Sequence, residues 1–167
     1  MAHWRLLSLA GYSVMKIMVA RIPEEGSSYN GSDPAAVMDL ADDPFVKVEG
    51  DVQYALHAQC VSEELIVRGR LSVDLGLKCI RCSEFFSTTV ADSDFLRAYP
   101  ASEDTDSVEI TPDMREDLLL HIPTFPICSE GCKGLCVQCG ANLNKGSCGC
   151  KEGPRPNPWL ALDNLNL

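Results

Sequence analysis

Alternation of apolar and polar residues is the dominant pattern in the middle of the chain. After a first run at 45–50, residues 52–59 alternate, and segments 65–71, 73–79 and 84–90 repeat the pattern. A two-residue period places successive side chains on opposite faces of a sheet. The pattern therefore predicts a strand-rich antiparallel core, in which the C-I-R-C sequence at Cys79–Cys82 turns a hairpin between its two flanking strands.

Two segments carry helix-start signals instead. A short helix is expected after Asp33 and Pro34, and a longer one from Thr111, which can cap it, with Pro112 in its first turn. The longer segment has one apolar stripe and two prolines that end it, namely Met114, Leu118 and Ile122, then Pro123 and Pro126. Together with the strands, these signals predict an α+β fold with one or two helices.

Cysteines supply the candidate chemistry. Eight of the nine form four close pairs: Cys79 and Cys82, Cys128 and Cys132, Cys136 and Cys139, Cys148 and Cys150. Two such pairs can hold one tetrahedral zinc ion, so four pairs predict two ions. Disulfides, redox thiols or an iron–sulfur cluster are the alternatives, but the sequence shows no convincing export signal, and we expect a reducing cytoplasmic location. Cys60 has no close partner and is expected to be a buried apolar thiol.

Chain length favours one pairing of the four cysteine pairs. The short loop between Cys139 and Cys148 lets the last four cysteines close a self-contained site, which leaves Cys79 and Cys82 to join Cys128 and Cys132 over a long range. The alternative crosses the pairs, with Cys79 and Cys82 joining Cys136 and Cys139. The two pairings remain open at the level of the sequence.

Length and composition fit one compact domain with an appended metal cluster. The 167 residues are 46% hydrophobic, which suffices for an ordinary core. We expect a lead segment at 1–17, which can be an extended start, an α+β core at 18–127, a zinc-binding knuckle at 128–152 and a proline-rich arm at 153–167.

The formal net charge of −10 limits how the chain could contact nucleic acid. Phosphate binding needs clustered cations, so any RNA contact must be local. The candidates lie in the cysteine-rich end: Lys133, Lys145, Lys151 and Arg155. The acidic residues between 92 and 117 are either a solvated surface or a docking surface for a basic partner.

The sequence offers little for catalysis. Its three histidines, His3, His57 and His121, lie far apart, and neither a glycine-rich phosphate loop nor a nucleophile motif is present. Zinc held by four thiolates is closed and structural. We therefore expect no enzymatic activity, with a thiol redox protein based on Cys79 and Cys82 as the enzymatic alternative.

Several motifs together resemble the YceD family of large ribosomal RNA subunit accumulation proteins. They are C-I-R-C before a strand, L-L-L-H-I-P at a helix end, P-I-C-S-E-G-C-K-G-L-C-V-Q-C-G-A-N-L-N and N-P-W-L-A-L. The likeness covers most of the chain from about Met18. Residues 1–17 have no counterpart, and Val137 stands where proline is frequent in such knuckles.

The resemblance implies a non-enzymatic role in ribosome biogenesis that supports accumulation of large-subunit (23S) rRNA. Some members keep only the C-x-x-C and a metal-capable pair after the helix, which supports joining Cys79 and Cys82 to Cys128 and Cys132. The implied partners are large-subunit rRNA or a pre-ribosomal particle, and a small basic ribosomal protein, without a membrane. A zinc-dependent chaperone of that ribosomal protein, with no direct RNA contact, is the alternative.

Overall fold

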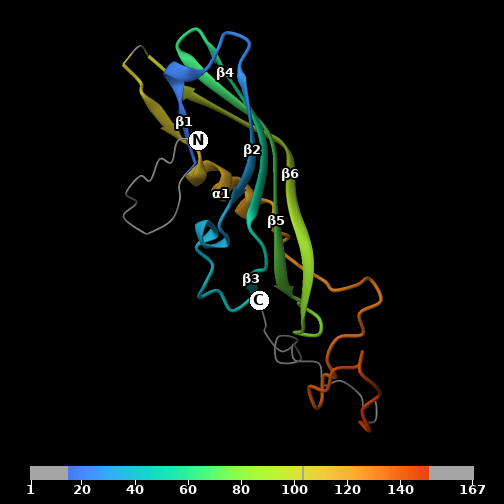
Figure 1. Ribbon diagram of the computed structural model, residues 1–167. Helices are drawn as coiled ribbons and strands as arrows, with labels where there is room; N and C mark the ends of the chain where they lie inside the picture. Colours follow the sequence, from blue (N-terminus) through green and yellow to red (C-terminus); the bar gives the residue numbers. More distant parts are fainter. Residues whose placement is uncertain (1–14, 103, 151–167) are drawn as a thin grey trace, which may run out of the picture.

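A five-stranded antiparallel sheet forms the body of the protein (Figure 1). The computed structural model describes residues 15–102 and 104–150. The central strand is β5 (Glu64–Lys78), and one of its edges pairs with β4 (Val52–Val61) and then with β3 (Val46–Val48). Its other edge pairs with β6 (Phe85–Pro100), while β2 (Ser27–Asp33) extends the sheet beyond β4.

Short elements complete the fold. Strand β1 (Lys16–Met18) pairs with β7 (Ser107–Glu109), and 3-10 turns η1 (Val19–Arg21) and η2 (Ala35–Met38) flank β2. Helix α1 (Thr111–Leu120) contacts β5 and β6 and passes behind the sheet in Figure 1. The predicted α+β, strand-rich antiparallel class is confirmed.

One core lies between the sheet and the elements behind it. Its fully buried side chains come from alternate positions of β4 and β5, from β6 and from α1, and include Leu56, Val67, Leu71, Phe95, Met114 and Leu118. Met15 and Ile17 are also buried in it. The core therefore begins earlier than the boundary expected at residue 18.

Both residues expected to cap helices bind each other instead. Asp33 ends β2 and is buried, and the Thr111 hydroxyl donates a 3.1 Å hydrogen bond to its Oδ2. The Met15 amide donates to the Thr111 hydroxyl at 2.7 Å. The short helix is a 3-10 turn after Pro34, and the residue before α1 is Ile110, neither with a side-chain cap. A buried tertiary hydrogen bond has taken the place of local capping at both positions.

The strands also differ in extent from the sequence expectation. Segments 65–71 and 73–79 form the single strand β5, and β6 continues to Pro100 rather than ending near residue 90. Strand β2 was not expected, because its sequence SSYNGSD has only one large apolar side chain. The predicted hairpin is confirmed, since Cys79–Cys82 lie at the turn that joins β5 to β6, where the Ser83 amide donates to the Cys79 carbonyl at 2.9 Å.

Gly69 lies at the register shift between β5 and β6, and we predict that Gly69→Ala destabilises the sheet. A Cβ there would stand 2.1 Å from the Ala55 carbonyl oxygen and 2.8 Å from the Leu56 Cα, so β4 would have to move away. The expected loss is about 1–3 kcal/mol of unfolding free energy. Denaturant unfolding measures it, with Gly50→Ala as the control, because its Cβ would meet nothing closer than 3.6 Å. Equal stability of the two variants would contradict the prediction.

Candidate metal centres

The β5–β6 turn and the segment after α1 bring four cysteines to one point. Cys79 and Cys82 lie on the turn, and Cys128 and Cys132 follow α1. The four sulfur atoms lie within 4.8 Å of one another, with Cys79–Cys132 at 3.9 Å and Cys82–Cys128 at 3.8 Å. This is the long-range pairing favoured above, and the crossed pairing is not what the structure shows.

These distances fit one tetrahedral zinc ion. Four sulfurs placed about 2.3 Å from a central ion stand about 3.8 Å apart. A disulfide would need about 2.05 Å, and all nine cysteines are free thiols. Three of the four are buried: Cys79, Cys82 and Cys132. The residues present therefore fit zinc, with Cys79, Cys82, Cys128 and Cys132 as its ligands.

The electrostatics of this cluster also call for a cation. Burial would raise the pKa of Cys79, but backbone hydrogen bonds, including one from the Cys128 amide at 3.4 Å, outweigh it and bring the pKa to about 6. In contrast, the contact with Cys132, together with burial, raises the pKa of Cys128 to about 12. Adjacent thiolates repel one another, so all four can ionise together only around a positive ion.

A second cluster lies further along the chain. The sulfurs of Cys136, Cys139, Cys148 and Cys150 also lie within 4.8 Å of one another. The Cys136 amide donates to the Ala141 carbonyl and the Gly140 amide to the Cys136 carbonyl, both at 2.8 Å. Gly140 has φ of 73°, a conformation that glycine adopts without a Cβ clash, as this knuckle requires. This site too has the donor set of a structural zinc site.

Two polar side chains that the sequence analysis did not single out hold the first cluster. The Asn144 amide donates to the Cys132 sulfur at 3.3 Å, and its Oδ1 accepts from the Lys133 amide at 2.8 Å. The Asn144 bond is the main reason why the pKa of Cys132 is lowered. Arg81 donates to the carbonyls of Glu130 and Cys132 at 3.3 Å. The N-L-N sequence next to the cysteines was the only available signal for Asn144.

The four candidate RNA-binding residues differ in whether the structure describes them and in whether they have a partner. The Lys145 ammonium forms an ion pair with Glu84 at 2.5 Å. This contact connects the second cysteine cluster to the β5–β6 hairpin. Asn142 also donates to Glu84, at 3.4 Å. Lys133 is exposed, whereas Lys151 and Arg155, like the arm 153–167, lie outside the described residues. The knuckle therefore offers fewer free cations than its sequence suggests.

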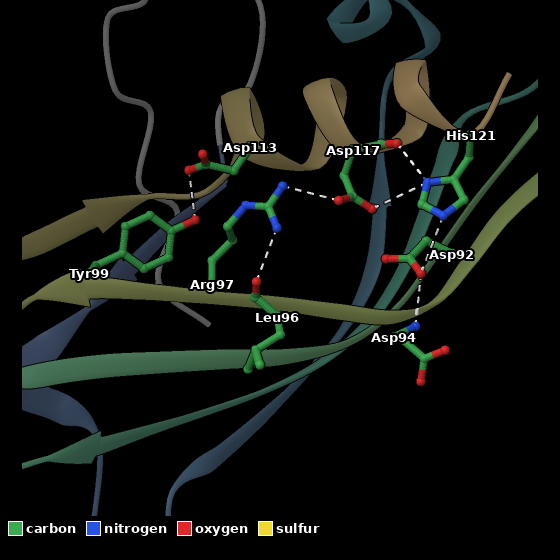
Figure 2. A network of polar contacts seen from close by, with 8 residues as sticks. All are labelled: Asp92, Asp94, Leu96, Arg97, Tyr99, Asp113, Asp117 and His121. Atoms are coloured by element: carbon green, nitrogen blue, oxygen red, sulfur yellow. Dashed lines mark hydrogen bonds and ion pairs between the residues drawn. The ribbon is translucent and has the colours of Figure 1, made fainter.

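A polar network fastens α1 to β6 just before the chain reaches Cys128 (Figure 2). Arg97 donates to Asp117 at 3.0 Å, and the Tyr99 hydroxyl donates to Asp113 at 2.6 Å. His121 Nδ1 bonds the Asp117 carbonyl at 2.8 Å and, since a carbonyl only accepts, this nitrogen carries the proton.

One corner of this network also brings together possible ligand atoms. Asp92, Asp117 and His121 place one such atom each within 4.8 Å of one another, and burial followed by the neighbouring Asp92 raises the pKa of Asp117. Because the Arg97 guanidinium already supplies positive charge to Asp117, we interpret the group as an ion-pair network.

Comparison with known proteins agrees with the sequence resemblance. Residues 92–166 match the family model described as "Large ribosomal RNA subunit accumulation protein YceD". This part of the chain is similar to the YceD family. The match covers α1 and six of the eight clustered cysteines, whereas Cys79 and Cys82 precede it. The similarity therefore lies in the region that carries most of the clustered cysteines.

Two plant relatives carry the YceD name. A chloroplastic protein of Arabidopsis thaliana, "Large ribosomal RNA subunit accumulation protein YCED homolog 1", is 38% identical over 58 residues, which are 35% of this chain and 18% of the relative. Its Zea mays namesake is 41% identical over 54 residues, 32% of this chain and 18% of the relative.

A bacterial relative matches over a longer stretch. An uncharacterised protein of Mycobacterium leprae is 28% identical over 102 residues, 53% of this chain and 47% of the relative. The chain thus spans about a fifth of the plant relatives and about half of the mycobacterial one. No solved structure matches this chain. Among the described residues, no helix is both long and apolar enough to cross a membrane.

We predict that the two cysteine clusters lose metal separately. Protein purified without added metal should contain close to two zinc equivalents by elemental analysis. Cys136→Ser should lose one and disorder only the region after about Cys132, whereas Cys79→Ser should also weaken the packing of the sheet's end, because its site joins the hairpin to the post-helix segment. Thermal unfolding and zinc content measure both effects.

The matched control for these variants is Cys60→Ser. Cys60 lies on β4 outside both clusters, so this variant should keep both zinc ions. Loss of both ions from Cys136→Ser would show that the clusters are not independent. A metal content near zero in the wild-type chain would refute the zinc assignment itself.

Asn144→Leu should weaken the first site without removing a ligand. This variant lacks the amide that donates a hydrogen bond to the Cys132 sulfur. Loss of such a supporting hydrogen bond typically lowers metal affinity by about 10–100-fold. Competition with a chromophoric chelator measures the affinity of each site. Gln59→Leu is the control, since this amide lies on β4 outside both clusters and donates to the Glu24 carbonyl. An unchanged first site in Asn144→Leu would show that the hydrogen bond does not support the metal.

Proposed function

We propose that this chain is a non-enzymatic ribosome biogenesis factor that supports accumulation of large-subunit (23S) rRNA. The observation that carries the proposal is the YceD-family match over 92–166, which includes α1 and most of both cysteine clusters. The plant relatives carry the same function in their names. The proposed site of action is a pre-ribosomal particle in the compartment that assembles it, which for a bacterial chain is the cytoplasm.

In this proposal two zinc ions are structural. Zinc bound by four thiolates has no open position for water or substrate, so it supplies cohesion rather than Lewis-acid chemistry. The first set, Cys79, Cys82, Cys128 and Cys132, holds the post-helix segment against the β5–β6 turn. The second set shapes the knuckle that folds back on Glu84 through Lys145.

A thiol redox function is less well supported. Reactive thiols need exposure, but Cys79 and Cys82 are 1% and 3% exposed. The chaperone alternative has the acidic composition in its favour. However, Asp113 and Asp117 already accept hydrogen bonds from Tyr99 and Arg97, so part of the acidic run faces the protein itself.

The test is complementation of a strain that lacks this gene. The wild-type chain and Cys60→Ser should restore the ratio of large- to small-subunit rRNA, whereas Cys79→Ser should not, because its metal-held segment comes apart. Capture of the tagged chain, with bound RNA and bound ribosomal proteins quantified separately, distinguishes an RNA contact from a chaperone. An rRNA ratio that does not depend on the chain, together with no association with large-subunit particles, would refute the proposal.

A further inference from the structure

One face of the main sheet is polar and carries no covering element within the described residues. Helix α1 lies behind the sheet in Figure 1, and the opposite face presents outward positions of β2, β4, β5 and β6. Two rows of side chains cross it: Ser28–His57–Arg68–Leu96, and Asn30–Ala55–Arg70. These residues line a shallow hollow of about 590 Å³.

Arg68 and Arg70 set this face apart in an acidic protein. Lys16, Arg97, Arg115 and Lys145 all form ion pairs with carboxylates. Within 15–102 and 104–150, neither the Arg68 nor the Arg70 side chain forms an ion pair, a hydrogen bond or a ring contact, and both residues are exposed. Two guanidinium groups on the same face of one strand repel each other, and no ion pair with a carboxylate relieves this repulsion.

We propose that this face, centred on Arg68 and Arg70, binds the phosphate backbone of single-stranded rRNA. The inference rests on the proposed function and names its RNA-contacting surface. Guanidinium groups bind phosphate in a bidentate manner. The two arginines are two residues apart along β5, so their Cα atoms stand about 7 Å apart, and each can reach its own phosphate on one extended strand. The same face also carries carboxylates, namely Asp94 at the rim of the hollow and Asp74 further along β5, which accepts a 2.6 Å hydrogen bond from the Thr89 hydroxyl.

The rest of the lining fits a sugar–phosphate chain. Ser28, Asn30 and Ser93 offer hydroxyl and amide groups for sugar and phosphate oxygens, and Ala55 and Gly69 leave room above the sheet. The outward rows include no Phe, Tyr or Trp on which bases could stack, and their one aromatic ring, that of His57, lies 3.4 Å from the Ser28 hydroxyl. Contact is therefore to the backbone, is independent of base sequence, and releases about two counterions.

This placement differs from an RNA contact through the knuckle. Lys145 is engaged with Glu84, whereas the sheet arginines are free. The two cysteine clusters then serve to hold the C-terminal segment, and the sheet face serves to bind. The test must therefore compare the two surfaces within the full chain.

The test measures binding of the zinc-loaded full chain to a labelled single-stranded 12-nucleotide oligo(U). The double variant Arg68→Gln with Arg70→Gln should lower the affinity for oligo(U) by more than about tenfold, because hydrogen bonds to charged groups contribute most to binding. The slope of log affinity against log salt concentration should decrease by about two. Zinc content and thermal unfolding should be unchanged, since neither arginine has a partner to lose. Arg68→Lys with Arg70→Lys should retain part of the affinity, because charge remains and bidentate geometry is lost.

Two controls remove the same or more charge elsewhere. Lys16→Gln with Arg21→Gln should bind oligo(U) like the wild type, as should the knuckle variant with Lys133, Lys145 and Lys151 replaced by Gln. Wild-type affinity in the Arg68 and Arg70 double variant overturns the proposal. Loss of oligo(U) binding only in the knuckle variant also overturns it. Binding of poly-glutamate without binding of oligo(U) overturns it as well, and would indicate an acidic protein partner.

Complementation separates this inference from the proposed function. If the wild-type chain and the Arg68 and Arg70 double variant restore rRNA levels equally, the surface assignment fails while the biogenesis role stands. If the wild-type chain itself does not affect rRNA levels, the biogenesis role fails. Loss of rRNA restoration only in the double variant, with zinc content intact, supports both.

Discussion

Four thiol groups at the end of the β5–β6 hairpin hold the C-terminal end of the described chain, from His121 onward, to the body. From His121 to Cys150 there is no helix or strand, only turns and one isolated bridge between Leu135 and Asn142. Large apolar side chains there, such as Phe125 and Val137, are exposed rather than packed. A segment with so little buried apolar surface cannot offset its conformational entropy by burial alone. Its ordering must come from the cysteine clusters and the hydrogen bonds around them.

The sheet and the cluster depend on each other through the hairpin. The long pairing of β5 with β6 fixes Cys79 and Cys82 in space, because the turn between the strands cannot move without breaking the ladder. Helix α1, fastened to β6 by Arg97 and Tyr99, fixes where the chain leaves toward Cys128. The core therefore places Cys79 and Cys82 and sets the point from which the chain leaves toward Cys128, which reduces the entropy of closing the loop between the two halves of the site.

The sequence predicted what local patterns determine. Alternation of apolar and polar residues identified β4 and β5, and the C-I-R-C turn followed from two such runs on either side of it. Strand β2 was not predicted, because Tyr29 is its only large apolar residue and its position depends on pairing with β4. Asp33 and Thr111 have the side chains of good caps, yet a partner distant in sequence satisfies both. Asn144 and Arg81 were missed for the same reason, since their roles depend on which backbone groups the fold brings near.

Charge separates the tasks of the two ends of the protein. A set of four thiolates around a divalent ion has a net charge of −2, so metal binding makes the knuckle more acidic and less suited to a phosphate backbone. Lys145 of the knuckle, which contacts Glu84, and Arg81 of the β5–β6 turn, which donates to two knuckle carbonyls, then offset charge around the clusters. Arg68 and Arg70 lie on the outward face of the sheet, away from the β5–β6 turn, where their cross-strand neighbours are Ala55, His57 and Leu96. An acidic protein that contacts RNA needs its few free cations away from its own metal-bound thiolates, and the sheet face is where this fold places two of them.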